Sequence, residues 1–172
     1  SREKGFDVLL RAFAGIAAQF PQWRVGILGE GVERESLRRL SEELQLAARV
    51  EFAGEVREVE TWMARAGLLV HPSRREGFPN VVLEAMGMGM AVISADCRAG
   101  PAELIENRVN GRLVPVDDVQ ALSRAMTELM SNPAERERLG GEARKVRERF
   151  APERIMARWE ACLRGEPLPE SP

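Results

Sequence analysis

The sequence lacks the features that mark several classes of protein. Its two cysteines, Cys97 and Cys162, lie far apart and match no metal or redox spacing, so we expect reduced thiols rather than a disulfide. No apolar run approaches the roughly 20 residues that span a bilayer, and no signal peptide is recognisable. Acids and bases nearly balance, with a formal net charge of −2, so nothing points to a nucleic-acid partner. These absences favour a cytoplasmic protein.

What is present indicates one globular domain. The 172 residues are 44% hydrophobic and 30% charged, which is a balance typical of a packed core with a solvated surface. The chain opens with Ser1 almost directly into a helical pattern, so we expect a piece of a longer protein. We predict a domain over residues 1–164, followed by a polar, proline-rich tail over residues 165–172.

The order of the expected elements indicates the fold class. Helical periodicity alternates with short, continuous apolar runs, which is typical of strands covered on both faces. We therefore predict an α/β fold, a Rossmann-like doubly wound parallel sheet with helices on both faces. The strands are expected at 24–28, 50–52, 68–70, 91–94 and 112–114. The helices are expected at 6–20, 37–44, 58–66, 80–88 and 101–105, and from 118 onward with breaks near 132–133 and 151–152.

Small residues follow the first two expected strands. Ligands of open parallel sheets bind beyond the carboxyl ends of the strands, where glycines permit close backbone approach. Gly29 and Gly31 follow one strand, and Gly54 to Val56 follow the next. No third glycine completes a dinucleotide fingerprint, so the Gly29–Gly31 pair is either a plain tight turn or a ligand loop.

Two glutamates flank the start of the helix expected at 80–88. Glu76 lies in the preceding loop, and Glu84 lies in the first turns of that helix. Carboxylates accept hydrogen bonds from vicinal hydroxyls, while the amides of residues 78–81 and the positive helix end favour a diphosphate. The alternative is a loop charge and a helix-terminal acid that only complements the dipole.

The segment around these glutamates resembles the signature of family-four retaining glycosyltransferases of the GT-B fold. It reads Pro-Ser-x-x-Glu-Gly-Phe-Pro-Asn-x-x-Leu-Glu-Ala-Met, with Glu76 and Glu84 as its two acids. The likeness extends along nearly the whole chain. The further matching elements are Lys4-Gly5 with Asp7 and Leu10, Gly29-x-Gly31, Phe52-x-Gly54, Gly89 with Val92, and Asn110-Gly-x-Leu-Val114.

The resemblance implies a role for each site residue. Lys4 would neutralise charge on the diphosphate leaving group, Glu76 would bind hydroxyls of the transferred sugar, and Glu84 would hold the ribose. Residues 54–56 would lie against the base. The implied catalytic residues are Glu76 and Lys4. The implied nucleotide-sugar-binding residues are Lys4, Gly29, Gly31, Gly54, Val56, Glu76, Gly77, Phe78, Pro79, Asn80, Val81 and Glu84.

The resemblance also implies the reaction and the partners. The donor would be a UDP-sugar, with a GDP-sugar as the alternative, and a hexose or N-acetylhexosamine would pass with retention to a glycan or lipid-linked acceptor. Neither a metal nor a cofactor is expected. The acceptor domain would be an N-terminal half outside this chain, so we expect the fragment to be inactive alone. Any contact with the inner face of the cytoplasmic membrane would come through that half.

The sequence departs from the family pattern in two further ways. The arginine usually found shortly before the Lys-Gly element is missing, and Arg2 has the wrong spacing to replace it. Gly89-Met-Ala91-Val92 also lacks the proline of the usual Gly-x-Pro-Val, which puts local rigidity in doubt.

Other conspicuous residues have ordinary interpretations. His71, the single histidine, is expected to be a packed side chain, with a catalytic role as the alternative. Asp117 and Asp118 are more typical of a helix N-cap than of a metal site. The last expected helix carries Trp159 and Leu163, whose apolar face we predict to be exposed and to drive self-association.

Two other functions stay open. One is a non-catalytic module that binds nucleotide-sugars, and the other is a Rossmann-type oxidoreductase domain. The incomplete glycine fingerprint disfavours the second.

Overall fold

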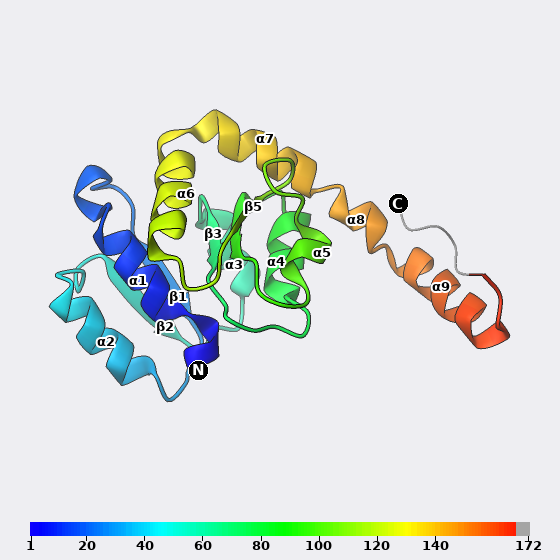
Figure 1. Ribbon diagram of the computed structural model, residues 1–172, viewed down its shortest axis with the longest axis horizontal. Helices are drawn as coiled ribbons and strands as arrows, with labels where there is room; N and C mark the ends of the chain where they lie inside the picture. Colours follow the sequence, from blue (N-terminus) through cyan, green and yellow to red (C-terminus); the bar gives the residue numbers. More distant parts are fainter. Residues whose placement is uncertain (168–172) are drawn as a thin grey trace.

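The computed structural model describes residues 1–167, in which strands and helices alternate (Figure 1). The strands are β1 (Val25–Leu28), β2 (Val50–Gly54), β3 (Leu69–His71), β4 (Val92–Ala95) and β5 (Arg112–Val114). The α-helices are α1 (Phe6–Ala14), α2 (Arg34–Glu43), α3 (Val59–Arg65), α4 (Asn80–Gly87), α5 (Pro101–Leu104), α6 (Val119–Ser131), α7 (Pro133–Ala143), α8 (Val146–Arg149) and α9 (Pro152–Arg164). Two 3₁₀ turns, η1 (Arg2–Lys4) and η2 (Ala17–Gln19), complete the set. The predicted tail begins after α9, and its residues 168–172 lie outside the described residues.

All strand pairs are parallel, as predicted, but the strands do not form one continuous sheet. β1 pairs with β2 in one ladder, and β3, β4 and β5 form a second ladder in that order. Among residues 1–167, no ladder joins β1 to β3. We call these the two-stranded half and the three-stranded half. The prediction of a parallel α/β fold with helices on both faces is confirmed. The structure differs from the prediction in that the strands form two separate ladders.

Helices cover both faces of the strands because successive side chains of a strand point to opposite sides. Ile93 of β4 packs in a cluster with α1 and α6, which includes Phe13 and Leu129. Val92, its neighbour in β4, packs in a second cluster with α4 that includes Met86. All four residues of β4 are buried, so the core runs on both sides of this strand.

Local sequence explains where the helices end. The helical pattern continues to residue 20, but α1 ends at Ala14, and the chain turns at Gly15 before η2. Asp118 caps α6 by accepting a hydrogen bond from the amide of Ala121 at 2.8 Å, so the N-cap interpretation of this residue is confirmed. Asn132 caps α7 in the same way, and Pro133 follows as the first helical residue, which explains the predicted break.

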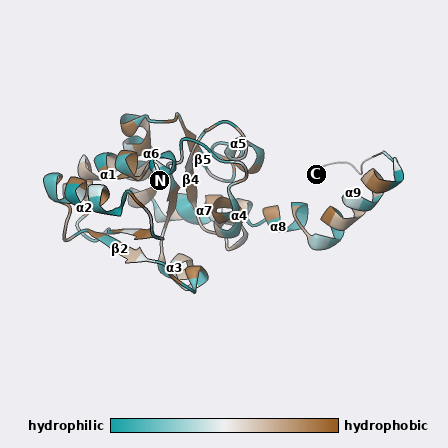
Figure 2. Cartoon of the chain, turned by 90° about the horizontal axis from the view of Figure 1, so that it is seen from below, coloured by the Kyte–Doolittle hydropathy of each residue, from teal (hydrophilic) through white to brown (hydrophobic). Residues whose placement is uncertain are grey.

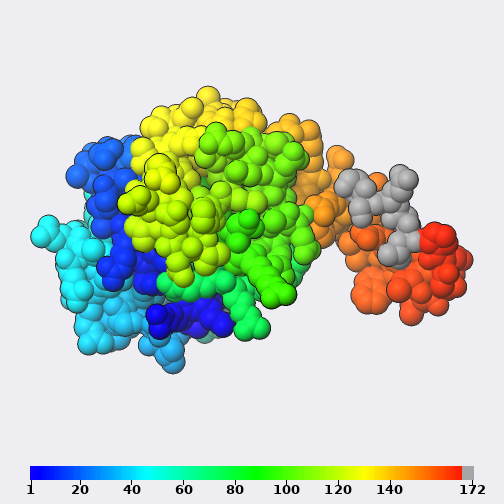
Figure 3. All heavy atoms as spheres, viewed as in Figure 1, coloured from blue at the N-terminus to red at the C-terminus, as the bar shows by residue number. Residues whose placement is uncertain are grey.

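The last helix stands apart from the rest of the molecule. α9 extends away from the body beyond α8 in both ribbon views, and its brown apolar and teal polar segments alternate (Figures 1 and 2). The space-filling view shows a constriction between the body and α9 (Figure 3). Met156, Trp159 and Leu163 are 57%, 61% and 82% exposed, which confirms that the apolar face is uncovered. Within the described residues, no helix is both long enough and apolar enough to cross a membrane.

Candidate functional site

The carboxylate of Glu76 is the centre of a hydrogen-bonded cluster at the carboxyl ends of the strands. It lies in the loop that joins β3 to α4 and is mostly buried, with a side chain 10% exposed. Lys4 Nζ donates to Glu76 Oε1 at 2.8 Å, and His71 Nε2 lies 3.0 Å from the same oxygen. Two side chains therefore hold one oxygen of this carboxylate.

His71 connects Glu76 to the interior of the three-stranded half. The residue ends β3, and its ring is buried. Nδ1 lies 3.0 Å from the hydroxyl of Ser94 in the neighbouring strand β4. A neutral ring fits both contacts, because Nε2–H then donates to Glu76 and Nδ1 accepts from the hydroxyl of Ser94. The expected packed histidine is thus also the residue that orients the carboxylate.

Burial and charge hold this cluster in a defined protonation state. Desolvation lowers the pKa of His71 below 6.5, although Glu76 opposes that shift. Desolvation also acts to raise the pKa of Glu76, but hydrogen bonding and charge from Lys4 and the effect of His71 outweigh it, and the net pKa is lowered. At neutral pH, Glu76 is therefore an anion beside a neutral imidazole and an ammonium group. The carboxylate can accept hydrogen bonds from hydroxyls.

Close backbone packing places Lys4 over Glu76. Gly5 follows η1 with φ of 65°, and a Cβ atom there would lie 2.0 Å from the carbonyl oxygen of Pro72. Only glycine combines this left-handed conformation with this close approach. This contact explains why a glycine follows Lys4. The glycine lets the N-terminal turn lie directly on the loop that carries Glu76. In Figure 3 the dark-blue N-terminal residues lie against this green segment.

Arg74 fastens the N-terminal turn to the same loop. Its guanidinium binds both carboxylate oxygens of Asp7 at 2.8 Å, and its Nε donates to Asp117 at 2.6 Å. Its backbone amide donates to the carbonyl of Glu3 at 2.7 Å, and its side chain also bonds the carbonyl of Arg2. The hydrogen bond from Arg74 lowers the pKa of Asp7. Arg74 thus joins three segments that are distant in the sequence.

The start of α4 offers fewer amides than the sequence suggests. Pro79 has no N–H, and the amide of Asn80 donates to the carbonyl of Phe78 at 3.1 Å. The amides of Phe78 and Val81 bond no other described residue, so two of the four expected donors remain for a phosphate. Pro79 is buried, and its neighbour Phe78 is 39% exposed.

Glu84 differs from Glu76 in its surroundings. It lies in the second turn of α4 and is exposed, and no other described side chain bonds its carboxylate. Gly77 has no atom within 4 Å of the place where a Cβ would lie, so the loop between the two glutamates is open to solvent. Glu84 is therefore accessible but not pre-oriented.

The glycine turns of the two-stranded half adjoin each other. The amide of Gly29 donates to the carbonyl of Gly54 at 2.6 Å, and both residues have positive φ, at 102° and 71°. A Cβ at Gly54 would lie 2.7 Å from Glu30, whose carboxylate pairs with Arg34. Gly31, which is exposed like Gly29, and the half-buried Val56 lie next to these turns in the sequence. The structure brings these residues together, and both a tight turn and a ligand loop remain compatible with them.

The described part of the chain contains neither a cluster of metal ligands nor a disulfide. Residues 1–167 contain no group of three or more histidine, cysteine or acidic side chains placed to hold a metal ion. Cys97 and Cys162 are both free thiols. Burial, together with the charge of Glu76, raises the pKa of Cys97, which keeps this thiol protonated.

Comparison with known proteins identifies the family. The family of glycosyl transferases group 1 matches residues 1–146, which is most of the chain. This chain belongs to the glycosyl transferases group 1 family. Its Rossmann-like architecture is that of GT-B glycosyltransferases, and the group 1 match extends from η1 to the first residue of α8, so it includes every site residue described above.

Individual relatives show how much of a group 1 protein is present. A lipopolysaccharide core biosynthesis mannosyltransferase, LpcC of Rhizobium leguminosarum bv. viciae, is 35% identical over 88% of this chain and 45% of its own length. HepE of Anabaena, solved with UDP, matches 96% of this chain and 46% of that chain, at 27% identity and a TM-score of 0.87. The fold also matches the C-terminal domain of a group 1 protein from Francisella tularensis, at 24% identity and a TM-score of 0.78. The chain thus spans less than half the length of the first two proteins and corresponds to a C-terminal domain.

Sequence reasoning missed part of this group 1 site. Lys4 and Glu76 are in direct contact, and the fastening through Arg74, Asp7 and Asp117 was not predicted. Asp7 stood inside a matching motif without a role of its own. For Arg74, nothing in the sequence indicated a role beyond its position in the loop that carries Glu76.

Proposed function

We propose that this domain binds the nucleotide-sugar donor of a retaining glycosyltransferase and supplies two of its catalytic groups. The observation that carries the proposal is the contact of Lys4 and His71 with one oxygen of Glu76, at 2.8 and 3.0 Å. An oriented carboxylate suits a sugar hydroxyl. A lysine beside it suits the negative charge that develops on a departing diphosphate.

The remaining predicted residues extend this site along the crevice. Glu84 is exposed and four residues beyond Asn80 in α4, so the two lie on the same side of the helix, at the end where the amides of Phe78 and Val81 are available. A carboxylate there suits the vicinal hydroxyls of a ribose, with the diphosphate over the helix start. The exposed glycines Gly29 and Gly31, next to the buried Gly54 and the half-buried Val56, suit close backbone approach by the rest of the nucleotide.

The preferred donor is a UDP-linked hexose or N-acetylhexosamine. A likeness to HepE, which was solved with UDP, supports a uridine carrier. The likeness to a mannosyltransferase keeps a GDP-sugar as the alternative. The acceptor is a glycan or a lipid-linked sugar. No metal or cofactor takes part in this proposal, because Lys4 and the helix start provide the positive charge.

The transfer reaction needs more than this chain. Lys4, beside Glu76, has a side chain 48% exposed, and the domain spans less than half the length of these two relatives. We infer that an N-terminal domain closes the cleft and binds the acceptor, and that the 172-residue chain alone transfers no sugar.

The test is donor turnover by the longer protein that carries this domain. UDP-N-acetylglucosamine, UDP-glucose and GDP-mannose are supplied with a mixture of glycan and lipid-linked acceptors, and release of the nucleoside diphosphate is measured. Anomer-resolved NMR of the product reports retention or inversion. Release from a UDP-sugar with retention supports the proposal, and an inverted product contradicts its stereochemistry.

A non-catalytic binding module is the second candidate, because Glu84 and the glycine turns require no chemistry. It predicts saturable binding of the donor with no turnover by the longer protein. Loss of turnover in a Glu76→Gln variant that still binds donor would decide for the enzyme.

A further inference from the structure

The hydroxyl of Ser94 has two acceptors within reach for its single proton. The residue lies in β4 and is completely buried. Its Oγ lies 3.1 Å from the carbonyl oxygen of Ala95 and 3.0 Å from Nδ1 of His71. A hydroxyl rotates about its C–O bond and carries one donor and two lone pairs. Ser94 can therefore either donate to the histidine ring or accept from it, without any movement of its oxygen.

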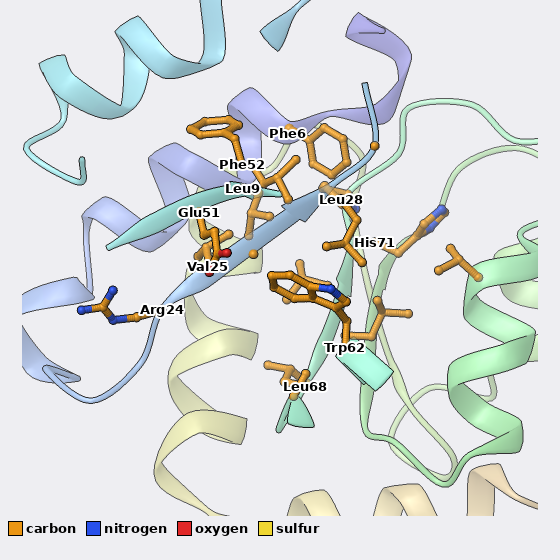
Figure 4. A pocket seen from close by; sticks show the side chains of 18 of the residues that line it. Phe6, Leu9, Arg24, Val25, Leu28, Glu51, Phe52, Trp62, Leu68 and His71 are labelled. Atoms are coloured by element: carbon orange, nitrogen blue, oxygen red, sulfur yellow. The ribbon is translucent and has the colours of Figure 1, made fainter. Parts of the chain in front are cut away.

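This freedom gives the ring of His71 two complete sets of partners. In Figure 4 the ring points toward α4 and away from Trp62. When the ring is neutral, Nε2–H donates to Glu76 Oε1, and Ser94 donates to Nδ1. When the ring is protonated, both nitrogens donate, to Glu76 and to Ser94, while the hydroxyl of Ser94 turns to the Ala95 carbonyl. Both ring nitrogens have a partner in either state, so protonation avoids the cost of an unpaired buried donor.

The titratable groups near the ring come from several segments. Glu76 lies in the loop between β3 and α4, and Lys4 comes from η1. Glu76 acts to raise the pKa of His71, while burial and the charge of Lys4 act to lower it. Cys97, which follows β4, is kept neutral because burial raises its pKa, and Glu84 of α4 is exposed. The proton affinity of the ring therefore depends on whether Lys4 stays beside Glu76.

Lys4 is the more easily removed partner of Glu76. Its side chain is 48% exposed, whereas the His71 ring is buried. Exposed ion pairs contribute little to stability, so an anion that binds Lys4 can draw the ammonium group away. Glu76 is mostly buried, and a buried carboxylate without a cationic partner is costly. The departure of Lys4 also removes the positive charge that opposes protonation of His71.

We propose that His71 and Ser94 form a proton-accepting pair that replaces Lys4 as the partner of Glu76 when Lys4 binds an anion. The proton comes from solvent and adds to Nδ1, and the hydroxyl of Ser94 turns to the Ala95 carbonyl. One ammonium group is exchanged for one imidazolium group, so Glu76 stays anionic and oriented. His71 and Ser94 are positioning residues, because they act through Glu76. The anion is the donor diphosphate, and this last assignment rests on the function proposed above.

NMR titration of the single histidine tests the pair in the 172-residue chain. Labelling histidine alone with ¹⁵N gives ring signals from His71 only, and they report its tautomer and its protonation. The neutral ring should carry its proton on Nε2. Lys4→Met removes the cation without adding an anion, so the midpoint of the titration should move to higher pH. Arg2→Met removes a cation two residues away and, as the matched control, should move the midpoint far less.

Ser94→Ala separates the proposed proton transfer from simple packing. Without the hydroxyl, Nδ1–H of the protonated ring loses its acceptor, so the midpoint should move to lower pH. The double variant with Lys4→Met should lose most of the upward shift. Ser41→Ala is the matched control, because Ser41 is also buried but its hydroxyl donates to the Arg38 carbonyl at 2.7 Å. It should leave the titration of His71 unchanged.

Calorimetry of UDP binding to the longer protein tests the coupling to an anion. Heats measured near pH 6.5, in buffers with different ionisation enthalpies, give the number of protons taken up per bound UDP. The wild-type protein should take up more protons than Ser94→Ala, and this difference cancels any proton that UDP itself releases.

The outcomes distinguish the pair from the donor site. An Nδ1–H tautomer in the neutral ring, or an unchanged midpoint in either Lys4→Met or Ser94→Ala, overturns the proposal. UDP binding with equal proton uptake in wild type and Ser94→Ala overturns the coupling to the donor. Failure of UDP to bind contradicts the proposed function instead, while the histidine titrations still decide whether the pair accepts a proton.

Discussion

The three-stranded and two-stranded halves of this domain differ in how deeply their strands are buried. In the three-stranded half, β4 is fully buried, and its neighbour β3 ends at a histidine that holds Glu76 in place. In the two-stranded half, β1 has one buried residue, and Gly29 and Gly31 beyond it are exposed. Glu76, whose carboxylate has two protein partners, is thus on the more buried half. The turns that would meet the nucleotide are on the half whose strand β1 pairs with β2 alone among the described residues.

The N-terminal turn connects these unequal halves. Gly5 and Arg74 fasten it to the three-stranded half, while α1 and η2 lead from it to β1. Lys4 is therefore positioned by the three-stranded half although it precedes the two-stranded half in the sequence. Variants that affect one half but not the other test this division, and they are given below in order of decreasing effect.

Loss of the Lys4 cation should have the largest effect. Lys4→Ala in the longer protein should lower kcat by about 10²–10³-fold, because one charged donor to the leaving group is lost. Turnover of donor is the measurement. Arg2→Ala removes a cation two residues away while keeping the carbonyl that Arg74 bonds, and it should reduce kcat far less. Equal losses in both variants would mean that the general charge of the turn matters, and not Lys4.

A side chain at Gly5 should detach the N-terminal turn. Gly5→Ala places a Cβ 2.0 Å from the Pro72 carbonyl at a positive φ, so unfolding free energy should fall by at least about 1–3 kcal/mol in urea denaturation. Gly77→Ala is the matched control, since nothing lies within 4 Å of its Cβ position and its φ is not positive. Its stability should change by less than about 0.5 kcal/mol. Similar losses in the two variants would contradict the close packing described here.

The two halves also offer a matched pair of arginines. Arg74→Ala removes the bidentate contact with Asp7 and the contact with Asp117, so it should cost about 1–3 kcal/mol of stability. Arg34→Ala removes a more exposed pair with Glu30, and about 0.2–1 kcal/mol should be lost. Thermal unfolding of both variants compares the halves directly. A larger loss for Arg34→Ala would reverse the comparison.

His71 should give the smallest effect, visible as a dependence on pH. Burial lowers its pKa, so the unfolded chain binds a proton more readily than the folded protein. The contribution of the neutral ring is complete above pH 6.5 and is lost as the pH falls from there to the lowered pKa. His71→Gln should remove this slope in the free energy of unfolding. The lowered pKa values of Glu76 and Asp7 act at lower pH, below 4.5, and should persist in the variant.

The sequence was enough to predict most elements, because their periodicity is strong and local. The breaks at Asn132 and Ala151 and the parallel pairing all follow from short-range patterns. The end of α1 at Ala14 was not predicted, since the apolar spacing continues past Gly15 into η2. The gap between β1 and β3 was not predicted either. It depends on which strands pair in space, and no pattern within the sequence specifies that pairing.

The site divides in the same way. The motif identified Glu76 and Lys4, and their contact supports that pairing. The role of His71 in orienting Glu76 was not predicted, because it depends on the register that places Ser94 beside it in β4. The amide of Asn80 donates to the carbonyl of Phe78 and is therefore not free for a phosphate. This hydrogen bond depends on local turn geometry, which residue types alone do not specify.

The most direct test of the account is calorimetric titration of this chain and of the longer protein with UDP, UDP-N-acetylglucosamine, GDP-mannose and NAD, repeated with Glu84→Ala. The account predicts saturable binding of UDP-type ligands by the longer protein, with an affinity that Glu84→Ala lowers, and weaker binding by the short chain. Binding of NAD by the longer protein without any nucleotide-sugar would contradict the proposed donor site and favour an oxidoreductase domain.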